Sequence, residues 1–262
     1  MKIHEVIKEL NQLSPPSYAL SWDNVGLSLG DSNREVKKIL VTLDVTNKVV
    51  EYAISNQVDF IISHHPLIFS PMKQINDSTV LGNKILKLAA KEIGCFAMHT
   101  NFDAVGGMAE LAKERLQLEE TKPFCECVEV DEKIEGIGRI GYLPKEMTVS
   151  QCADFVKQQF NLSSVAVYGD LERKVKKVAV SPGSGRHMIE DALSQQVELF
   201  ITGDIGHHEG LDAIDGNLAV IDAGHYGLEH IFVPFVADYL TKVLSKDILV
   251  EQMEASTPFV IR

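Results

Sequence analysis

The chain has 262 residues, 45% of them hydrophobic, and a mean hydropathy of +0.01, values that fit a globular protein with a well-filled core. No apolar run approaches the roughly 18 residues that a membrane-spanning helix needs, so we expect no membrane as a partner. The net charge of −12 argues against nucleic acid as a partner, because binding to phosphates needs a concentrated cationic surface.

The first predicted element is an amphipathic helix that stops at Pro15-Pro16. Its apolar stripe recurs at helical spacing and consists of Ile3, Val6, Ile7, Leu10 and Leu13. No apolar signal region follows the opening segment Met1–Glu5, so we expect the protein to stay in the cytoplasm. The next stretch, Ser21–Leu27, is expected to form a loop.

A β-α-β unit follows this loop. The residue pattern predicts a strand over Lys38–Leu43, a helix over Thr46–Asn56 and a strand over Asp59–Ser63. This order is typical of a parallel sheet, whose neighbouring strands need a crossover connection. His64 and His65 come directly after the second strand. Since successive side chains of an extended chain diverge, the pair can serve two different centres.

The same unit occurs a second time in the sequence. The segment Val36–His65 aligns without gaps on Val175–Asp204, with 10 identities in 30 positions. The alignment predicts an internal duplication, and it places Gly203-Asp204 where the first copy carries His64-His65. We therefore expect two related halves that present different chemistry at equivalent strand ends, with a metal site between the halves.

The remaining elements complete the two predicted halves. The apolar patterns predict helices over Val80–Ile93, Gly107–Leu118, Thr148–Phe160 and Gly224–Leu244, and strands over Cys95–His99, Phe124–Val130, Ile137–Leu143, Ser164–Tyr168, Leu218–Asp222 and Ile248–Glu251. We expect an α/β fold with mixed sheets flanked by helices. The first half is predicted to span residues 1–122, completed by residues 223–262, and the second half to span residues 123–222.

Two glycine-rich segments resemble phosphate-binding loops in their residue types. Gly136–Gly141 matches a dinucleotide-binding fingerprint, but Tyr142-Leu-Pro144 follows where that motif requires a helix N-terminus, so we reject a dinucleotide site. Ser181–Gly185 joins a strand to a helix and either cradles a phosphate or forms a tight turn. We favour the turn, because the segment lacks the lysine of a P-loop.

Metal-type side chains follow several of the predicted strands. His225 and Glu229 stand four residues apart at the start of a predicted helix, which places imidazole and carboxylate on one helical face, about 6 Å apart at their Cβ atoms. Taken alone, they could equally be an exposed pair at a helix start. Together with His64 and His65 at another strand end, they favour a metal site.

Asp103 follows the predicted Cys95–His99 strand, in a stretch expected to be a loop. By itself this carboxylate would be a turn residue or a helix N-terminal partner. With the residues above it completes a mixed set of nitrogen and oxygen ligands, which suits Zn, Mn, Fe or Co, and one carboxylate can bridge two ions about 3.5–4 Å apart. We therefore expect two divalent cations per chain. Their predicted ligands are His64, His65, Asp103, His225 and Glu229.

Four further residues are candidates for carrying protons or facing the substrate. An open metal site needs orienting groups and a proton carrier near the bound water. The alternative for each candidate is a structural residue that only completes hydrogen bonds near a strand end. The four residues are His99, Asp204, His207 and His208.

Six short motifs, taken together, resemble one known family. They are Trp22–Leu27, Ser63–Pro66, His99–Asp103, Gly136–Arg139, Thr202–Asp204 and His225–Glu229. The chain is similar over essentially its whole length to the proteins called GTP cyclohydrolase 1 type 2 homologues, or NGG-interacting-factor-like proteins. The resemblance implies a toroidal homohexamer whose metals face an internal cavity. It also implies a dinuclear site on the five ligands above, with Glu229 as the bridging carboxylate.

Two functions are compatible with this pattern. The leading hypothesis is a metal-dependent hydrolase in which two ions activate a water molecule against a small anionic or nucleotide-like substrate. The family name alone suggests a GTP cyclohydrolase-type activity. The alternative is a metal-stabilised toroidal scaffold or regulatory binding protein without turnover. An enzyme should leave water-occupied metal positions that face a cavity, whereas a scaffold should saturate its ions with protein ligands.

Overall fold

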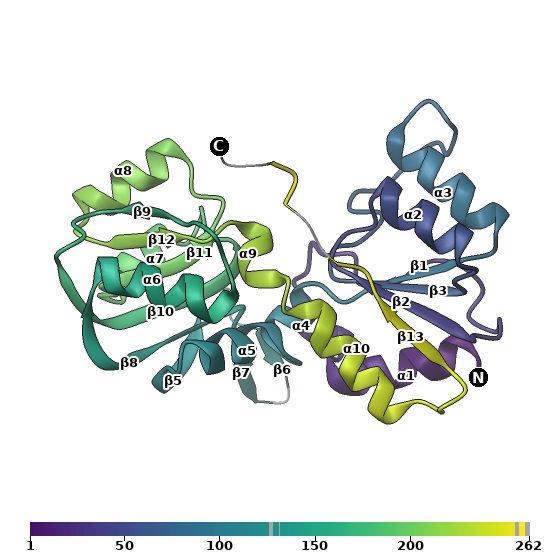
Figure 1. The fold of residues 1–262 in the computed structure, drawn as a ribbon, viewed down its shortest axis with the longest axis horizontal. Coiled ribbons are helices and arrows are strands. Elements are labelled where there is room, and N and C mark those ends of the chain that lie inside the picture. Colours follow the sequence, from purple (N-terminus) through teal and green to yellow (C-terminus); the bar gives the residue numbers. More distant parts are fainter. Residues whose placement is uncertain (126–127, 131, 255–256, 260–262) are drawn as a thin grey trace. The chain divides into compact units, whose positions relative to one another are not determined.

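The computed structural model describes residues 1–125, 128–130, 132–254 and 257–259. The chain forms two compact units, each described here by itself. Unit 1 contains Met1–Gly106 and the segment that begins at Phe232, and unit 2 contains Gly107–Ile231. Each unit is built on a mixed sheet with flanking helices (Figure 1). The predicted α/β class with mixed, helix-flanked sheets is thereby confirmed.

Unit 1 contains a five-stranded sheet with the order β1-β4-β3-β2-β13. Its strands are β1 (Gly26–Leu29), β2 (Lys38–Thr42), β3 (Phe60–Ser63), β4 (Gly94–Ala97) and β13 (Leu249–Gln252). The last four strands are mutually parallel, and β1 pairs antiparallel with β4. Strands β3 and β4 are buried along their whole length, which explains their continuous apolar sequences.

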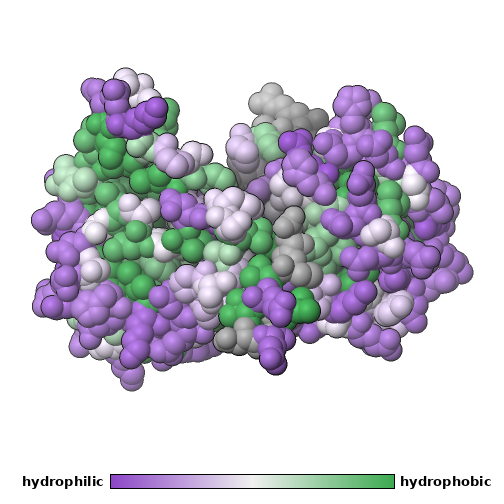
Figure 2. Space-filling view, turned by 180° about the vertical axis from the view of Figure 1, so that it is seen from behind, coloured by the Kyte–Doolittle hydropathy of each residue, from purple (hydrophilic) through white to green (hydrophobic). Residues whose placement is uncertain are grey.

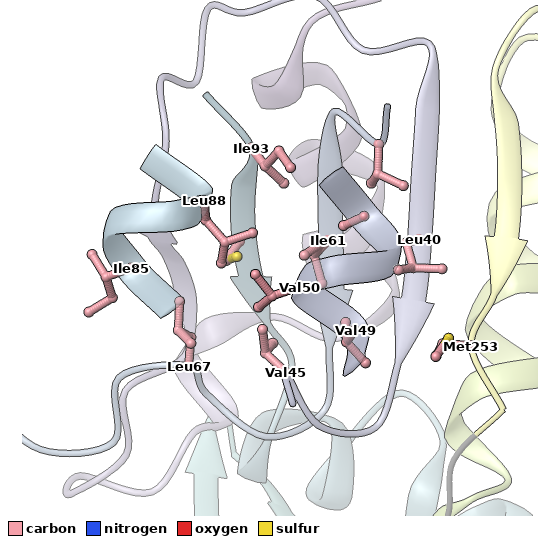
Figure 3. Close-up of a cluster of buried hydrophobic side chains, with 13 residues drawn as sticks. Leu40, Val45, Val49, Val50, Ile61, Leu67, Ile85, Leu88, Ile93 and Met253 are labelled. Carbon is pink, nitrogen blue, oxygen red and sulfur yellow. The ribbon is translucent and has the colours of Figure 1, made fainter. Parts of the chain in front are cut away.

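Helices cover both faces of the unit 1 sheet, with α2 and α3 on one side and α1 and α10 on the other (Figure 1). The helices are α1 (Ile3–Leu13), the short 3₁₀ turn η1 (Pro16–Tyr18), α2 (Asn47–Ser55), α3 (Val80–Ala90), α4 (Thr100–Ala104) and α10 (Phe232–Val243). Figure 3 shows the core beneath α2 and α3, where Val49 and Val50 pack with Leu40, Ile61 and Leu88. This core fixes the strands whose carboxyl ends carry the polar residues described below.

Unit 2 contains a six-stranded sheet with the order β5-β8-β10-β11-β12-β9. Its strands are β5 (Glu119–Phe124), β8 (Gly138–Thr148), β9 (Ala166–Tyr168), β10 (Lys174–Ser184), β11 (Leu199–Gly203) and β12 (Ala219–Asp222). Strands β10, β11 and β12 are parallel, whereas β8 pairs antiparallel with β10 and β9 with β12. A separate two-stranded ribbon is formed by β6 (Val128–Val130) and β7 (Lys133–Glu135).

The helices of unit 2 pack on this sheet. They are α5 (Met108–Arg115), α6 (Val149–Phe160), α7 (Ile189–Ser194), α8 (His207–Asp215) and α9 (His225–Glu229). Ile189 of α7 and Ala213 of α8 share one core with Phe200 of β11 and Val220 of β12. Helix α6 begins at a capping box in which the Thr148 hydroxyl accepts the amide hydrogen of Gln151 and the Gln151 side chain accepts the amide hydrogen of Thr148.

The two aligned segments have the same local structure. Ile39 of β2 lies opposite Phe60 of β3, and the aligned Val178 of β10 lies opposite the aligned Leu199 of β11. In both units, therefore, the crossover joins two parallel strands in the same register. This agreement is what the alignment leads one to expect, while the duplication itself stays an inference from the sequence.

A carboxylate-to-backbone hydrogen-bond pattern at the start of each segment also occurs in both units. The carboxylate of Asp59 accepts the backbone amides of residues 37 and 38, at 2.8 and 3.0 Å. The aligned Glu198 accepts the backbone amides of residues 176 and 177, at 2.7 and 2.8 Å. Each carboxylate thus ties the start of one strand to the start of its parallel neighbour.

The prediction of one long helix over Gly224–Leu244 was wrong. The segment forms two helices, α9 and α10, which are separated at His230 and Ile231. Pro234 lies in the first turn of α10, where its missing N–H is tolerated. A continuous helix would need that N–H to bond the carbonyl of His230, and the proline ring would clash with it.

Several elements were not predicted, among them β1, α4 and α8. Strand β1 occupies part of the expected Ser21–Leu27 loop and pairs with β4. Helix α4 contains Asp103, which was expected in a loop. A single turn has little helix-forming tendency of its own. Tertiary contacts hold α4, because Asn101 accepts the His99 amide and donates to the carbonyl of Ser14.

Residues 126 and 127 of the predicted Phe124–Val130 strand lie outside the described residues, as do residues 255–256 and 260–262 of the segment predicted to complete the first half. Within the part of the chain that the structure describes, no helix combines the length and the apolar character needed to cross a bilayer. The face drawn in Figure 2 carries hydrophilic residues over most of its area, with hydrophobic areas between them.

Candidate metal centre

The polar residues of unit 1 lie where its parallel strands end. Asp44 follows β2, His64 and His65 follow β3, and His99 follows β4 and precedes α4. Parallel strands bring their carboxyl ends to one edge of the sheet, and ligand sites of open α/β sheets form outside that edge. The same rule brings together residues that are far apart in the sequence.

His64 is fully buried, and its ring orientation is fixed by the backbone. Its Nδ1 lies 2.8 Å from the carbonyl oxygen of Met98. A carbonyl can only accept a hydrogen bond, so Nδ1 carries the hydrogen and Nε2 of the neutral ring presents a lone pair. That Nε2 lies 3.6 Å from Oδ1 of Asp103. The lone pair is the feature that a metal ion requires of histidine.

His65 and His99 are oriented in the same way by carboxylates. Nδ1 of His65 lies 2.8 Å from Oδ1 of Asp44, and Nδ1 of His99 lies 2.9 Å from Oδ1 of Asp23. An ionised carboxylate only accepts, so both rings donate through Nδ1. Metal-binding histidines in proteins are held in this manner, with the second ring nitrogen bonded to a carboxylate or carbonyl.

These side chains form a compact group, which we call the unit 1 cluster and which consists of His64, His65, His99 and Asp103. One ligand nitrogen from each of the three histidines lies within 4.8 Å of the other two. Asp103 joins the cluster from α4, with its side chain only 12% exposed. The unit 1 cluster therefore places three imidazole nitrogens within reach of a common cation, and the sheltered carboxylate of Asp103 lies beside one of the three rings, His64.

Unit 2 contributes a second group, the unit 2 pair of His225 and Glu229. Helix α9 places the two residues one turn apart, with Nε2 of His225 3.1 Å from Oε2 of Glu229. Nδ1 of His225 lies 2.8 Å from Oδ2 of Asp204, an acceptor that again assigns the hydrogen to Nδ1. The Glu229 side chain is 4% exposed. A charged carboxylate at such a depth needs a compensating positive charge.

A glycine makes room for the unit 2 pair. Gly183 of β10 has φ +78°, and a Cβ on its backbone would lie 2.5 Å from Oε1 of Glu229 and 3.8 Å from Nε2 of His225. Only glycine adopts this backbone conformation without strain and leaves the carboxylate its space. The glycines of Ser181–Gly185 thus include one that serves the carboxylate of Glu229.

The donor set of these groups fits a transition-metal ion. All four imidazoles donate through Nδ1 to an oxygen that only accepts, and the two carboxylates beside them are sheltered. Mixed imidazole and carboxylate ligation suits Zn, Mn, Fe or Co. These histidine, glutamate and aspartate groups could therefore bind metal, as the sequence predicted in general terms.

The remaining sequence candidates lie in different surroundings. Asp204 is exposed and contacts His225, so within unit 2 it orients that ring. His207 and His208 are exposed at the first turn of α8, with their ring centroids 5.3 Å apart. Among the described residues, neither belongs to a group of ligand atoms that could hold a metal. Their role as proton carriers stays a prediction.

Sequence reasoning missed the residues that orient the imidazoles. Asp23 and Asp44 were not candidates, although each contacts a candidate histidine more than 20 positions away. Asp23 had a signal, because it belongs to the Trp22–Leu27 motif on which the family resemblance rests. Gly183 also had one, since its segment was recognised as a tight glycine-rich turn.

Asp23 carries a large carboxylate pKa shift. Burial would raise its pKa, but the hydrogen bond and charge of His99 and two hydrogen bonds from Thr100 outweigh that effect. Together they lower the pKa of Asp23 from 3.8 to about 2. The side chain is 1% exposed, so this ionised carboxylate is held almost wholly within the protein.

Comparison with known proteins shows which family the chain matches. The sequence profile of the Duf34/NIF3 (NGG1p interacting factor 3) family matches residues 1–258. The GTP cyclohydrolase 1 type 2 homolog of Clostridium acetobutylicum is 33% identical over 262 residues, covering 100% of this chain and 95% of that protein. The homolog of the same name from Lactococcus lactis is 34% identical, with 99% of each chain covered. A Bacillus cereus protein related to NIF3 has a similar crystal structure, with a TM-score of 0.90, 25% identity and coverage of 100% and 99%.

The pKa shift of Asp23 predicts how stability depends on pH. The folded pKa lies below the unfolded value, so ionisation stabilises the fold fully above about pH 4, by about 2 kcal/mol, and this contribution disappears as the pH falls towards 2. We expect Asp23→Asn to lower the free energy of unfolding by about this amount at pH 7, and the difference from the wild type to shrink below pH 4. Urea denaturation across this pH range measures it.

The exposed Asp247→Asn variant is the matched control and should follow the wild type at every pH. A difference between Asp23→Asn and the wild type that stayed constant down to pH 2 would contradict the assigned pKa.

Proposed function

The chain belongs to the DUF34/NIF3 family, and on this premise we propose that it is a dinuclear metal protein that hydrolyses a small anionic or nucleotide-like substrate. The observation that carries the proposal is the shared orientation of the four imidazoles. In each ring Nδ1 lies within hydrogen-bond distance of an oxygen that only accepts, although these acceptors come from different parts of the sequence.

Two divalent ions per chain are proposed, each Zn, Mn, Fe or Co. The proposed ligands are His64, His65 and Asp103 from unit 1 and His225 and Glu229 from unit 2. Glu229 is the proposed bridging carboxylate, because it is the more deeply buried of the two carboxylates and the space beside it is kept open by Gly183.

Bound divalent ions would supply Lewis acidity and a water molecule ionised near neutral pH. The other contributions come from the chain itself. His99 is the proposed proton carrier, because Asp23 fixes its ring while a ring nitrogen lies near those of the other cluster imidazoles. Asp44 and Asp204 are positioning residues that hold His65 and His225.

The name shared by the curated relatives makes GTP the first nucleotide to test as a substrate. A homohexamer is proposed as the assembly on the same family grounds. Sedimentation velocity of the metal-loaded protein measures its mass directly.

The metal ligands are tested by elemental mass spectrometry of the purified chain. We expect about two ions per chain in the wild type and a clear loss of occupancy in His65→Gln and Glu229→Gln, which remove one ligand nitrogen and the proposed bridging charge. His208→Gln is the matched control, because this exposed histidine lies outside both groups. Full metal occupancy in both ligand variants would contradict the proposed set of ligands.

A second expectation concerns the orienting carboxylates. Asp44→Ala removes the acceptor that fixes His65, so we expect metal affinity to fall about 10- to 100-fold without loss of a direct ligand. Competition with a chromophoric chelator measures the affinity. The exposed Asp77→Ala variant, which removes the same charge elsewhere in unit 1, should bind metal like the wild type.

A hydrolysis assay distinguishes a hydrolase from a scaffold without turnover. We expect metal-loaded protein, and not chelator-treated protein, to hydrolyse a member of a panel of phosphoesters, nucleotides and cyclic amides. His99→Gln should lose about 100-fold in kcat, because it removes the proposed proton carrier, and its metal content is measured alongside its turnover. Metal-loaded protein that gains thermal stability but hydrolyses no member of the panel would favour the metal-stabilised scaffold instead.

A further inference from the structure

Two exposed aromatic side chains lie beside the unit 1 cluster. Trp22 is 57% exposed and Phe69 is 53% exposed, and their ring centroids are 6.0 Å apart. Each also contacts His99 edge-on, at 5.9 and 5.7 Å between centroids with interplanar angles of 73° and 67°. We call Trp22 and Phe69 the aromatic platform.

The platform is held in place from beneath. Asn24, two residues after Trp22, donates its side-chain amide to the carbonyl of Ile68 at 2.6 Å, which ties the two loops that carry the rings. Asp23 anchors the first loop through its bonds to His99 and Thr100. The backbone on which the rings stand is therefore fixed, while the rings themselves face outward.

The loop that carries Phe69 is long for a simple connection. Residues 64–79 join β3 to α3 and form no helix or strand. Loops of more than about 12–15 residues without regular structure in a compact domain are usually functional. This one begins with the His64-His65 pair, so the same connection supplies both candidate ligands and one of the two platform rings.

We propose that the aromatic platform is a substrate subsite that stacks a planar heteroaromatic ring of purine type beside the unit 1 cluster. The inference rests on the proposed function and names the class of substrate that this function would act on. Stacking on aromatic side chains contributes about 1–3 kcal/mol per base and requires only a flat ring with two open faces. Exposed Trp and Phe rings with a fixed backbone supply that surface at little entropic cost.

The position of His99 links the platform to the chemistry. Its ring contacts both platform rings and also lies 5.2 and 5.5 Å, centroid to centroid, from His64 and His65. The His99 ring thus lies between the platform, where a substrate ring would stack, and the imidazoles of His64 and His65. The charged group next to Trp22 is the carboxylate of Asp23, so the platform favours the uncharged ring of a nucleotide over its phosphates.

Trp22 makes the test direct, because it is the single tryptophan of the chain. Its fluorescence reports on the platform alone. Metal-loaded full-length protein is titrated with GTP as the ring-bearing probe and with tripolyphosphate as a matched probe without a ring, and free tryptophan amide corrects for absorption by the purine. We expect saturable quenching by GTP and no comparable change with tripolyphosphate.

Variants assign the quenching to the platform. Phe69→Ala should raise the apparent Kd for GTP about tenfold, since it removes one of two stacking surfaces and leaves the fluorophore in place. Ile75→Ala is the matched control, because Ile75 is also 53% exposed, lies on the same loop and belongs to neither the platform nor the cluster. Its Kd should equal that of the wild type.

The outcomes separate this inference from the proposed function. Equal responses to the two probes, or no response in protein shown to carry its metal, overturn the subsite and leave metal binding intact. Ring-dependent quenching in a chain that takes up no metal overturns the proposed function and leaves the subsite standing. A blue shift of Trp22 that depends only on protein concentration assigns the platform to a contact between copies of the chain and overturns the subsite.

Discussion

One interaction recurs at all four imidazoles of the two groups, a hydrogen bond from Nδ1 to an oxygen that can only accept. The acceptor is the carbonyl of Met98 for His64 and a carboxylate for His65, His99 and His225. Histidine offers a metal its lone pair only in the right tautomer and orientation, and this bond fixes both. The chemistry of the two groups therefore depends on residues that are not themselves ligands.

The parallel sheets explain how those acceptors reach the histidines. In unit 1, β2 ends before Asp44 and β3 before His65, and the neighbouring strands bring the two side chains together. At the aligned positions unit 2 carries Gly183 and Asp204. The carboxylate of Asp204 bonds to His225, which follows the next strand end. Gly183 stands at the position aligned with Asp44, and because it has no side chain it leaves space for Glu229. One β-α-β framework thus supports two different sets of donors.

Burial sets the electrostatics of both groups. Asp23 remains ionised at 1% exposure because His99 and Thr100 donate to it, and its lowered pKa measures that stabilisation. Glu229 and Asp103 lie at similar depth beside imidazoles. Burying these carboxylates costs free energy of desolvation, and a bound cation would offset that cost. In contrast, Trp22 and Phe69 leave large apolar rings in water, which adds no stability and is compatible with a ligand.

The features that depend on near neighbours along the chain could be predicted from the sequence. Apolar runs located β3 and β4, the 3.6-residue stripe located α1, and the four-residue spacing of His225 and Glu229 placed them on one helical face. It missed the break before Pro234, although that signal is local, because the apolar stripe continues through it.

The other features depend on contacts between segments that are distant in the sequence. The bonds of Asp23 to His99 and of Asp44 to His65, the single turn of α4 around Asp103, and the approach of Trp22 to Phe69 all join segments that are distant in sequence. Periodicity records the face that a residue turns to the core, and it carries no information about which distant loop arrives there. Packing of the strands and of the loops at their carboxyl ends makes that choice.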